Sequence, residues 1–314
     1  MSGAHRTAVI VNPKSAGGRT GRVWTSLAKR IEARLGPLTI RFTERGGHAT
    51  ALARELLTAG CDRIIAVGGD GTVNEVANGF VLDGRPIRPD AAMALLPLGT
   101  GSDFQRTLGI PSAPEAAIDY LVTGVPVEID LGRITFRAYD GSTVTRCFAN
   151  LTSFGMGGEV ASRAKNSFAV FGGKAAFLWA TLVTFFKYRA RSVRIRLDDA
   201  PEQHAFSILN IAVGNGRYHG GGMHVCPRAS MSDGLLEVTV IDDLGMLTLV
   251  RDLHVLYSDD LYRHPKTHHF RARKLLAESD DITRIEVDGE ALGTLPLEIT
   301  VLPKAMRVLA PRTL

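Results

Sequence analysis

Residues 64–76 read Ile-Ile-Ala-Val-Gly-Gly-Asp-Gly-Thr-Val-Asn-Glu-Val. The apolar run at 64–67 predicts a buried strand, and the spacing of Val73 and Val76 predicts a helix after the glycines. Glycines let backbone N–H groups approach a ligand closely, and the start of a helix favours anions. This corner suits a phosphate group, although a tight turn without a ligand has the same pattern. Because Asp70 would repel phosphate, we expect it to orient a metal ion or a hydroxyl.

The same succession of strand, glycine-rich turn and helix occurs three more times before residue 110. The apolar runs at 7–12, 38–42 and 92–96 are each followed by a turn that contains glycine. Alternating strands and helices predict a parallel sheet, and ligands bind such sheets at the carboxyl ends of the strands. We therefore expect an α/β domain whose four turns converge on one ligand.

The composition is typical of a globular protein with about two domains. The chain has 314 residues, of which 45% are hydrophobic and 22% charged, with a net charge of +5. Its three cysteines are far apart, which fits a reducing cytoplasm. Residues 1–6 are polar and strand-like residues follow at once, so we expect no signal peptide. A nucleic-acid partner is disfavoured, since the basic residues form no dense run with interleaved aromatics.

The sequence changes from helical to strand-like patterns near residue 128. Strand-like runs occupy residues 128–136, 144–151, 193–197, 206–213, 235–241 and 282–287, and a hairpin turn is expected at 139–142. They predict a mainly antiparallel β domain.

An apolar insertion at about 168–188 has basic flanks at Lys174, Lys187, Arg189 and Arg191. Its apolar core is too short to span a bilayer. It fits either a buried helix at a domain interface or a lip that dips into an anionic membrane surface.

Six motifs, in order, resemble the catalytic domain of the diacylglycerol and sphingosine kinases. They are NPKSAGG (12–18), TERGGHA (43–49), GGDGTVNEV (68–76), PLGTGSDF (97–104), GNGRYHGGG (214–222) and VDGE (287–290). The resemblance implies an α/β domain at 1–128 with a parallel sheet, like that of phosphofructokinase and NAD kinase. It implies an all-β sandwich at 129–302, which binds the lipid substrate, and a tail at 303–314 that returns to the first domain.

The activity implied by the resemblance is Mg²⁺-dependent transfer of the γ-phosphoryl group of ATP to a lipid hydroxyl, in phospholipid metabolism. Glu290 would accept the hydroxyl proton, with Asp288 as the alternative, and Asp70 and Asp103 would organise the catalytic Mg²⁺ or the hydroxyl. The residues implied at the nucleotide are Asn12, Pro13, Lys14, Ser15, Ala16, Thr43, Gly68, Gly69, Asp70, Gly71, Thr72, Val73, Asn74, Glu75, Thr100, Ser102, Asp103 and Arg106.

Two positions depart from the pattern of the family. Ser102 stands where the family has asparagine, which puts one hydrogen bond near the nucleotide in doubt. In bacterial relatives the loop at 227–235 binds a structural Mg²⁺. Asp233 and the Leu235 carbonyl fit this role here, but Ser230 replaces an acidic ligand. Because Mg²⁺ favours carboxylate and water oxygens, we expect this site to be weak or absent.

Two other functions remain open at this point. An NAD kinase also carries GGDGT, and a non-catalytic sensor of lipid or nucleotide would account for Ser102 and Ser230. The sequence does not name the acceptor lipid, and it does not decide between a monomer and a homodimer. The resemblance and the basic flanks of the insertion together lead us to expect a cytoplasmic protein that contacts an anionic membrane surface at its periphery.

Overall fold

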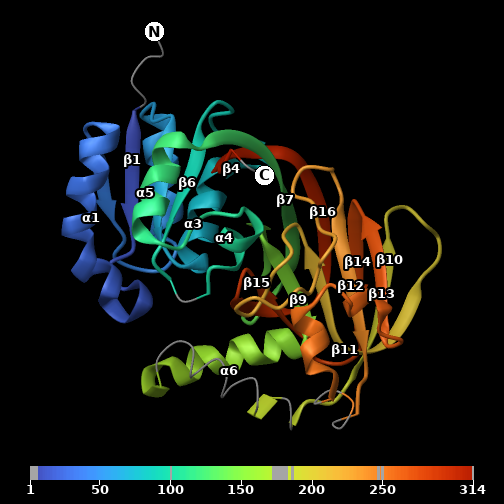
Figure 1. Ribbon diagram of the computed structural model, residues 1–314. Helices are drawn as coiled ribbons and strands as arrows, with labels where there is room; N and C mark the ends of the chain where they lie inside the picture. The colour runs from blue at the N-terminus through green and yellow to red at the C-terminus, as the bar shows by residue number, and fades with distance from the viewer. Residues whose placement is uncertain are drawn as a thin grey trace. The chain divides into compact units, whose positions relative to one another are not determined.

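The computed structural model describes residues 6–99, 101–171, 183–184, 187–245, 248 and 251–312. The chain divides into two compact units (Figure 1). Unit 1 comprises Met1–Asp130 and Pro303–Leu314, and unit 2 comprises Leu131–Leu302. Within the described ranges no helix is long and apolar enough to cross a bilayer.

Unit 1 alternates strands and helices along the chain. Each helix has a buried apolar face; in α1, for example, Trp24, Leu27 and Ile31 are buried. The helices pack in pairs, α1 beside α5 and α2 beside α3. The elements are β1 (Thr7–Val11), η1 (Ser15–Gly18), α1 (Arg19–Leu35), β2 (Thr39–Phe42), α2 (His48–Thr58), β3 (Arg63–Gly68), α3 (Asp70–Phe80), β4 (Val81–Leu82), β5 (Arg85–Pro86), β6 (Ala92–Pro97), α4 (Asp103–Thr107) and α5 (Pro114–Thr123).

The strands of unit 1 lie in the order β6-β3-β1-β2, and every neighbouring pair is parallel. The last residues of β16 add a further parallel strand beside β6, with Val308 opposite Met93. Val11 of β1 lies opposite Val67 of β3, which in turn lies opposite Leu96 of β6. Because these strands end at the same level, the turns that follow them lie along one edge of the sheet.

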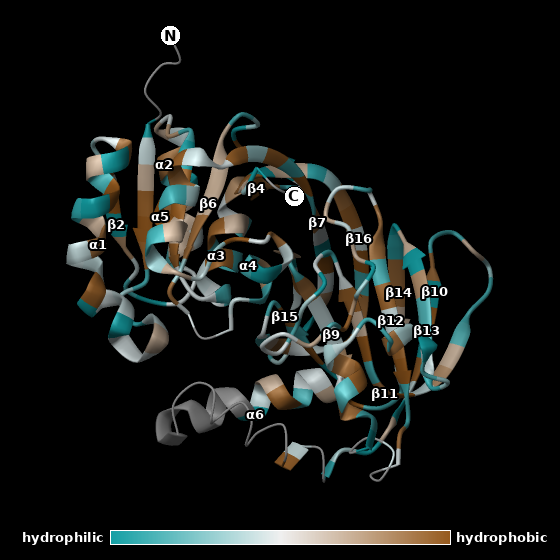
Figure 2. Cartoon of the chain, in the orientation of Figure 1, coloured by the Kyte–Doolittle hydropathy of each residue, from teal (hydrophilic) through white to brown (hydrophobic). Residues whose placement is uncertain are grey.

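Unit 2 consists mainly of antiparallel strands. Polar and apolar residues alternate along them, as the colours of Figure 2 show for strands such as β10. Its elements are β7 (Val125–Ala138), β8 (Thr143–Phe148), β9 (Leu151–Gly155), α6 (Met156–Phe171), β10 (Arg191–Leu197), β11 (His204–Gly214), β12 (Leu236–Asp242), η2 (Leu253–Tyr257), η3 (Leu261–Arg263), β13 (Thr267–Ala272), β14 (Lys274–Glu278), β15 (Arg284–Val287) and β16 (Glu290–Ala310). β7 and β16 continue from one unit into the other.

The pairings of unit 2 close on themselves, from β11 through β9, β15, β16, β14 and β10 back to β11. One face of these strands forms the core, which includes Phe154, Ile211 and Ile285. The alternate residues point to the opposite face, where α6 packs against β9, β11 and β15. Ser153 and Glu286 lie on that second face.

The strand-like runs in unit 2 correspond to β7, β8, β10, β11, β12 and β15, with ends that differ by a few residues. β9, β13 and β14 were not predicted. In β13, His268, His269 and Arg271 interrupt the apolar alternation. The helix of the insertion begins earlier than the expected residue 168, at Met156. Most of the apolar stretch after Phe171, with Lys174, lies outside the described residues.

Candidate active site

The turns at the carboxyl edge of the unit 1 sheet are joined by hydrogen bonds. Asn12 Nδ2, after β1, donates to Thr72 Oγ1 in α3 at 3.0 Å. The Thr43 amide, after β2, donates to the Val11 carbonyl at 2.9 Å. Lys14 Nζ donates to the Glu44 carbonyl at 3.3 Å. The structure therefore brings together three of the turns that the sequence singled out.

The fourth turn contacts the third through glycine backbones. The amides of Leu98 and Gly99 both donate to the Gly68 carbonyl at 3.0 Å. A Cβ atom on Gly99 would lie 2.3 Å from the Gly69 Cα, which is too close for any side chain. A Cβ on Gly68 would collide with the side chain of Thr72, 2.5 Å from its Oγ1. Glycine is required at position 99 because backbone packs directly against backbone, and at position 68 because the Thr72 side chain fills the space.

Asp70 connects the start of α3 to the start of α4. Its Oδ2 accepts a hydrogen bond from the Ser102 amide at 2.8 Å. Burial raises the pKa of the Asp70 carboxyl, and the negative charge of Asp103 raises it further, whereas hydrogen bonds from loop amides oppose the rise. Asp103 is itself buried and accepts a hydrogen bond from Arg106 at 2.9 Å. The two carboxylates thus form a buried acidic pair beside the glycine turns.

Ser102, the departure from the family pattern, has a strained backbone. Its φ of 63° lies in the left-handed region, and its side chain makes no capping bond to α4. A residue other than glycine in this region destabilises the fold by roughly 1–2 kcal/mol, and asparagine is the side chain most often tolerated there.

We expect Ser102→Asn to raise the thermal midpoint by about 1–3 °C, because asparagine relieves part of this strain. Differential scanning calorimetry measures the change. Ser102→Ala is the matched control, since alanine keeps the strain, and it should give no increase. A lower midpoint for Ser102→Asn would contradict this explanation.

Glu75 binds the backbone at the start of α2. Its Oε1 accepts a hydrogen bond from the Gly47 amide at 2.8 Å, and its Oε2 accepts one from the Ala49 amide at 3.0 Å. Both oxygens are therefore used to cap the start of α2. Glu75 thus positions α2, and its place in the nucleotide pocket stays a prediction. Thr100 lies outside the described residues.

The remaining residues predicted at the nucleotide lie in or beside the turns. Val73 and Asn74 are buried in α3, so Val73 offers only its backbone. Ala16, in the turn after β1, adopts a left-handed φ of 51°. Arg106 Nη1 also donates to the Gly101 carbonyl at 3.4 Å, which ties it to the fourth turn. The residues near the carboxyl edge of the sheet are Asn12, Pro13, Lys14, Ser15, Ala16, Thr43, Gly68, Gly69, Asp70, Gly71, Thr72, Val73, Asn74, Ser102, Asp103 and Arg106.

The two acids of the VDGE motif, Asp288 and Glu290, have separate roles. Asp288 Oδ1 accepts hydrogen bonds from the amides of Asn150 at 3.1 Å and Leu151 at 2.8 Å, and its Oδ2 accepts one from Ala149 at 2.9 Å. Asp288 therefore holds the turn between β8 and β9, and its lone pairs are poorly placed to accept a substrate proton. Glu290 is exposed at the start of β16, which makes it the better candidate for that task.

The loop predicted to hold a structural Mg²⁺ does not fit the ion. Asp233 forms an ion pair with Arg271, and its Oδ1 accepts a hydrogen bond from the Leu235 amide at 3.0 Å. The guanidinium of Arg271 also lies 3.5 Å from the Glu237 carboxylate. A fixed positive charge thus already occupies the place between these carboxylates. Among the described residues no group of three or more metal-binding side chains is found.

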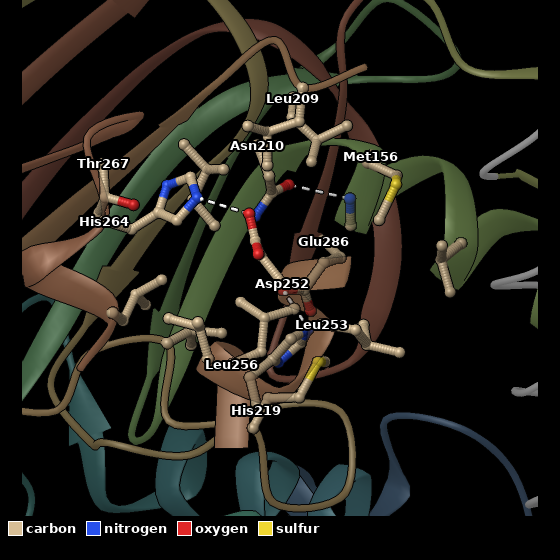
Figure 3. Close-up of a pocket in the computed structure, with 18 of the residues that line it drawn as sticks. Met156, Leu209, Asn210, His219, Asp252, Leu253, Leu256, His264, Thr267 and Glu286 are labelled. Carbon is tan, nitrogen blue, oxygen red and sulfur yellow. Dashed lines mark hydrogen bonds and ion pairs between the residues drawn. The ribbon is translucent and has the colours of Figure 1, made fainter. Parts of the chain in front are cut away.

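An apolar pocket of about 160 Å³ lies in unit 2 (Figure 3). Its walls come from α6, β11, β12 and the 3₁₀ segment η2, and they include Met156, Val160, Leu209, Ile241, Leu253 and Leu256. A few polar groups interrupt this surface, notably Glu286, His219 and Asn210. The lining also includes Gly289, the residue between Asp288 and Glu290.

The polar residues of this pocket were not singled out from the sequence. Glu286 interrupts the apolar run Ile285 to Val287, and this lone charge in a buried strand was the available signal. His219 belongs to the glycine-rich stretch 214–222, which resembled a family motif without indicating a role for the histidine. Pairing between distant strands brings the two residues together.

Two family models match the chain. The model of the diacylglycerol kinase catalytic domain matches residues 6–134, and the model of the YegS C-terminal NAD kinase beta sandwich-like domain matches residues 148–310. Together they cover most of both units.

Individual relatives agree with these models. A Mycobacterium tuberculosis protein named diacylglycerol kinase is 31% identical over 313 residues, which covers 98% of this chain and 96% of that protein. A Pseudomonas aeruginosa protein named "Probable lipid kinase YegS-like" is 33% identical over 311 residues, covering 96% and 93%. The crystal structure of a diacylglycerol kinase from Bacillus anthracis shares the fold, with a TM-score of 0.73 over 99% of both chains at 23% identity. The chain therefore belongs to the YegS and diacylglycerol kinase family of lipid kinases.

Proposed function

We propose that the protein transfers the γ-phosphoryl group of ATP to a hydroxyl group of a lipid, with Mg²⁺ as the metal ion. The observation that carries this proposal is the apolar pocket of unit 2, whose lining includes Gly289, the residue before Glu290 in the chain. A hydrocarbon chain in this pocket gains the free energy of apolar burial, and its polar end then lies near a carboxylate. The phosphate-bearing NAD would meet apolar walls and the carboxylates of Glu286 and Asp252, so an NAD kinase activity is disfavoured.

For the nucleotide, the proposed site is the carboxyl edge of the unit 1 sheet. The first amides of α3 have no partner within the helix, and together with the dipole of the helix they favour phosphate. Lys14 and Arg106 add positive charge in the neighbouring turns. The parallel order β6-β3-β1-β2 supports the further proposal that unit 1 is of the phosphofructokinase and NAD kinase type.

The acidic pair of Asp70 and Asp103 fits a catalytic Mg²⁺. Mg²⁺ prefers oxygen ligands and is usually held by one or two carboxylates together with substrate phosphates. The repulsion that raises the pKa of Asp70 would be relieved by a cation at this place. When bound, Mg²⁺ would neutralise charge on the phosphates during transfer.

In unit 2, Glu290 is proposed to accept the proton of the lipid hydroxyl. It is exposed, it follows directly on the pocket residue Gly289, and the turn that carries it is held by Asp288. Removal of this proton makes the hydroxyl oxygen a better nucleophile for phosphorus. Asp288 acts as a positioning residue, since its oxygens bind backbone amides.

The experiment that tests the lipid site uses a long-chain alkylglycerol with a photoreactive diazirine near the end of its chain. After irradiation, mass spectrometry should find the label on peptides that contain Met156 to Ala161 and Leu253 to Leu256. An excess of unlabelled alkylglycerol should prevent this labelling. Label confined to other peptides would contradict the assignment of the pocket.

We further propose that the protein contacts anionic membranes through a basic cluster in unit 2. A second cavity, of about 150 Å³, is lined by four basic residues together with Glu159 and Tyr188. The basic residues are Arg163, Lys187, Arg189 and Arg191. Lys187 and Arg189 are exposed. Each basic residue near an anionic surface contributes about 1 kcal/mol to binding.

We expect the double variant Lys187→Gln, Arg189→Gln to bind vesicles that contain phosphatidylserine roughly 10- to 30-fold more weakly than the wild type. Co-sedimentation at low ionic strength measures the affinity. The matched control is Arg137→Gln, Arg146→Gln, which removes two exposed cations elsewhere in unit 2. An equal loss in the control would show that net charge alone, rather than this cluster, determines binding.

A further inference from the structure

The polar end of the apolar pocket in unit 2 contains a carboxylate oxygen without a hydrogen-bond donor. Glu286 is 0% exposed, and its Oε2 accepts a hydrogen bond from the Gly289 amide at 2.7 Å. Its Oε1 accepts none from any residue that the structure describes. The imidazole of His219 faces this carboxylate, with its Nε2 3.5 Å from Glu286 Oε1 (Figure 3). A buried carboxylate oxygen in this state is unfavourable unless a ligand supplies a donor.

Two further polar residues, Ser153 and Asn210, lie near Glu286. Ser153 of β9 lies opposite Glu286 of β15, on the face that α6 covers. Ser153 Oγ is also buried and has no hydrogen-bond partner among the described residues. Asn210 of β11 accepts a hydrogen bond from the Gly157 amide at 2.9 Å. Of these, Glu286 and Asn210 line the pocket, and the unsatisfied Glu286 oxygen inside an otherwise apolar pocket points to a polar group on the ligand.

The other carboxylate of the pocket shows that such a lack of partners is not general. Asp252 Oδ1 accepts a hydrogen bond from Arg251 at 2.7 Å, and its Oδ2 lies 3.2 Å from His264 Nε2. Both of its oxygens are therefore satisfied within the protein. Glu286 and Asp252 line the same pocket. A ligand could donate a hydrogen bond to the unsatisfied oxygen of Glu286, whereas both oxygens of Asp252 already accept one.

The distance between Glu286 and His219 indicates which chemical group of the ligand could bind both side chains. His219 Nε2 and Glu286 Oε1 are 3.5 Å apart. A charge-assisted hydrogen bond is shorter, at roughly 2.7–2.9 Å. A hydroxyl group can donate to the carboxylate and, when His219 Nε2 carries the proton, accept from the imidazole at the same time, whereas an ammonium group can only donate. A phosphodiester would be repelled by Glu286. The pair is therefore suited to an uncharged hydroxyl.

We propose that the acceptor lipid is uncharged and carries a second free hydroxyl beside the one that is phosphorylated. Glu286 and His219 bind the second hydroxyl, while Glu290 receives the proton of the first. The geometry permits this because Gly289, which donates to Glu286, immediately precedes Glu290. This inference rests on the proposed function and deepens it, since a diacylglycerol has only one free hydroxyl and would leave Glu286 unsatisfied.

Three alkyl lipids with the same chain and the same terminal hydroxyl test the proposal. They are 1-O-hexadecylglycerol, its analogue with hydrogen in place of the 2-hydroxyl, and its 2-O-methyl ether. Phosphorylation from radiolabelled ATP is measured in detergent micelles. The wild type should show a kcat/KM about 10- to 100-fold higher for the diol, because the other two lipids cannot donate to Glu286. Equal kcat/KM for all three lipids would overturn the inference.

Two variants test which residue binds the second hydroxyl of the lipid. Glu286→Gln keeps an acceptor for the Gly289 amide but removes the charge, so the preference for the diol should fall to about threefold or less. Asp252→Asn, the matched carboxylate in the same pocket, should keep the full preference. If Glu286→Gln does not fold, the comparison of the three lipids in the wild type decides alone. An undiminished preference in folded Glu286→Gln would overturn the assignment.

Failure of the inference and failure of the proposed function give different results. Labelled product from all three lipids at equal rates overturns only the second-hydroxyl site. Absence of labelled product from every lipid, in protein shown to bind ATP, overturns the proposed function and this inference together.

Discussion

Glu290→Gln is expected to lower kcat for lipid phosphorylation by about 10²- to 10⁴-fold, the usual contribution of a general base. The amide has the size of the carboxylate but cannot take up the proton of the hydroxyl. Because Glu290 is exposed at the start of β16, the thermal midpoint should stay within about 1 °C of the wild type. Steady-state kinetics with saturating ATP, together with calorimetry, measure both quantities.

The control for this variant lies on the same strand. Glu298→Gln removes a half-buried carboxylate that lies 3.6 Å from Lys274, and it should keep activity near that of the wild type. Asp288→Asn should behave differently from both, because one amide oxygen cannot replace two oxygens that accept three backbone bonds. Its thermal midpoint should fall. Wild-type turnover in Glu290→Gln would remove Glu290 from its proposed role.

Asp70→Asn is expected to lower kcat by about 10²- to 10³-fold without lowering stability at neutral pH. The loss of activity follows from the loss of one of two carboxylates proposed to organise Mg²⁺. The fold is preserved because the amide oxygen of asparagine can still accept the hydrogen bond of the Ser102 amide. Kinetics at several Mg²⁺ concentrations and thermal unfolding test the two halves of this expectation.

The pH dependence gives this variant a distinctive signature. Since burial raises the pKa of Asp70 in the folded protein, its ionisation opposes folding. This unfavourable contribution is absent at acid pH, where the carboxyl is protonated in both states, and it develops as pH rises through the raised pKa. The midpoint of Asp70→Asn relative to the wild type should therefore increase from acid to neutral pH. The exposed control Asp90→Asn should show no such trend, and a decreasing difference for Asp70→Asn would contradict the assignment.

Local sequence patterns predicted much of unit 1. An apolar run that ends in glycine, followed by helical spacing, defines a strand, a turn and a helix within about twenty residues, as in β3 and α3. The order of such repeats also indicated that their turns would lie at one edge of the sheet. β13 escaped prediction because its polar residues take part in networks, such as that of His269 with Glu237, which no local pattern reveals.

The candidate site could be predicted only in part, for a related reason. Motifs identified Asp70, Asp288 and Glu290, but their different environments depend on contacts between distant segments. Asp288 binds the amide of Leu151, 137 positions earlier in the chain, and this contact separates its role from that of Glu290. The pocket with Glu286 exists because β9 pairs with both β11 and β15. Arg271, at the expected metal loop, comes from a strand that was itself not predicted.

The most direct test of the proposed function incubates the purified protein with Mg²⁺, radiolabelled ATP and a total lipid extract, and separates the products by chromatography. Incubation with NAD and with buffer alone runs in parallel. We predict a labelled lipid band that is absent with Glu290→Gln and present with Glu298→Gln. Label in the nucleotide product of NAD, or no labelled lipid from protein that binds ATP, would contradict the proposed lipid kinase activity.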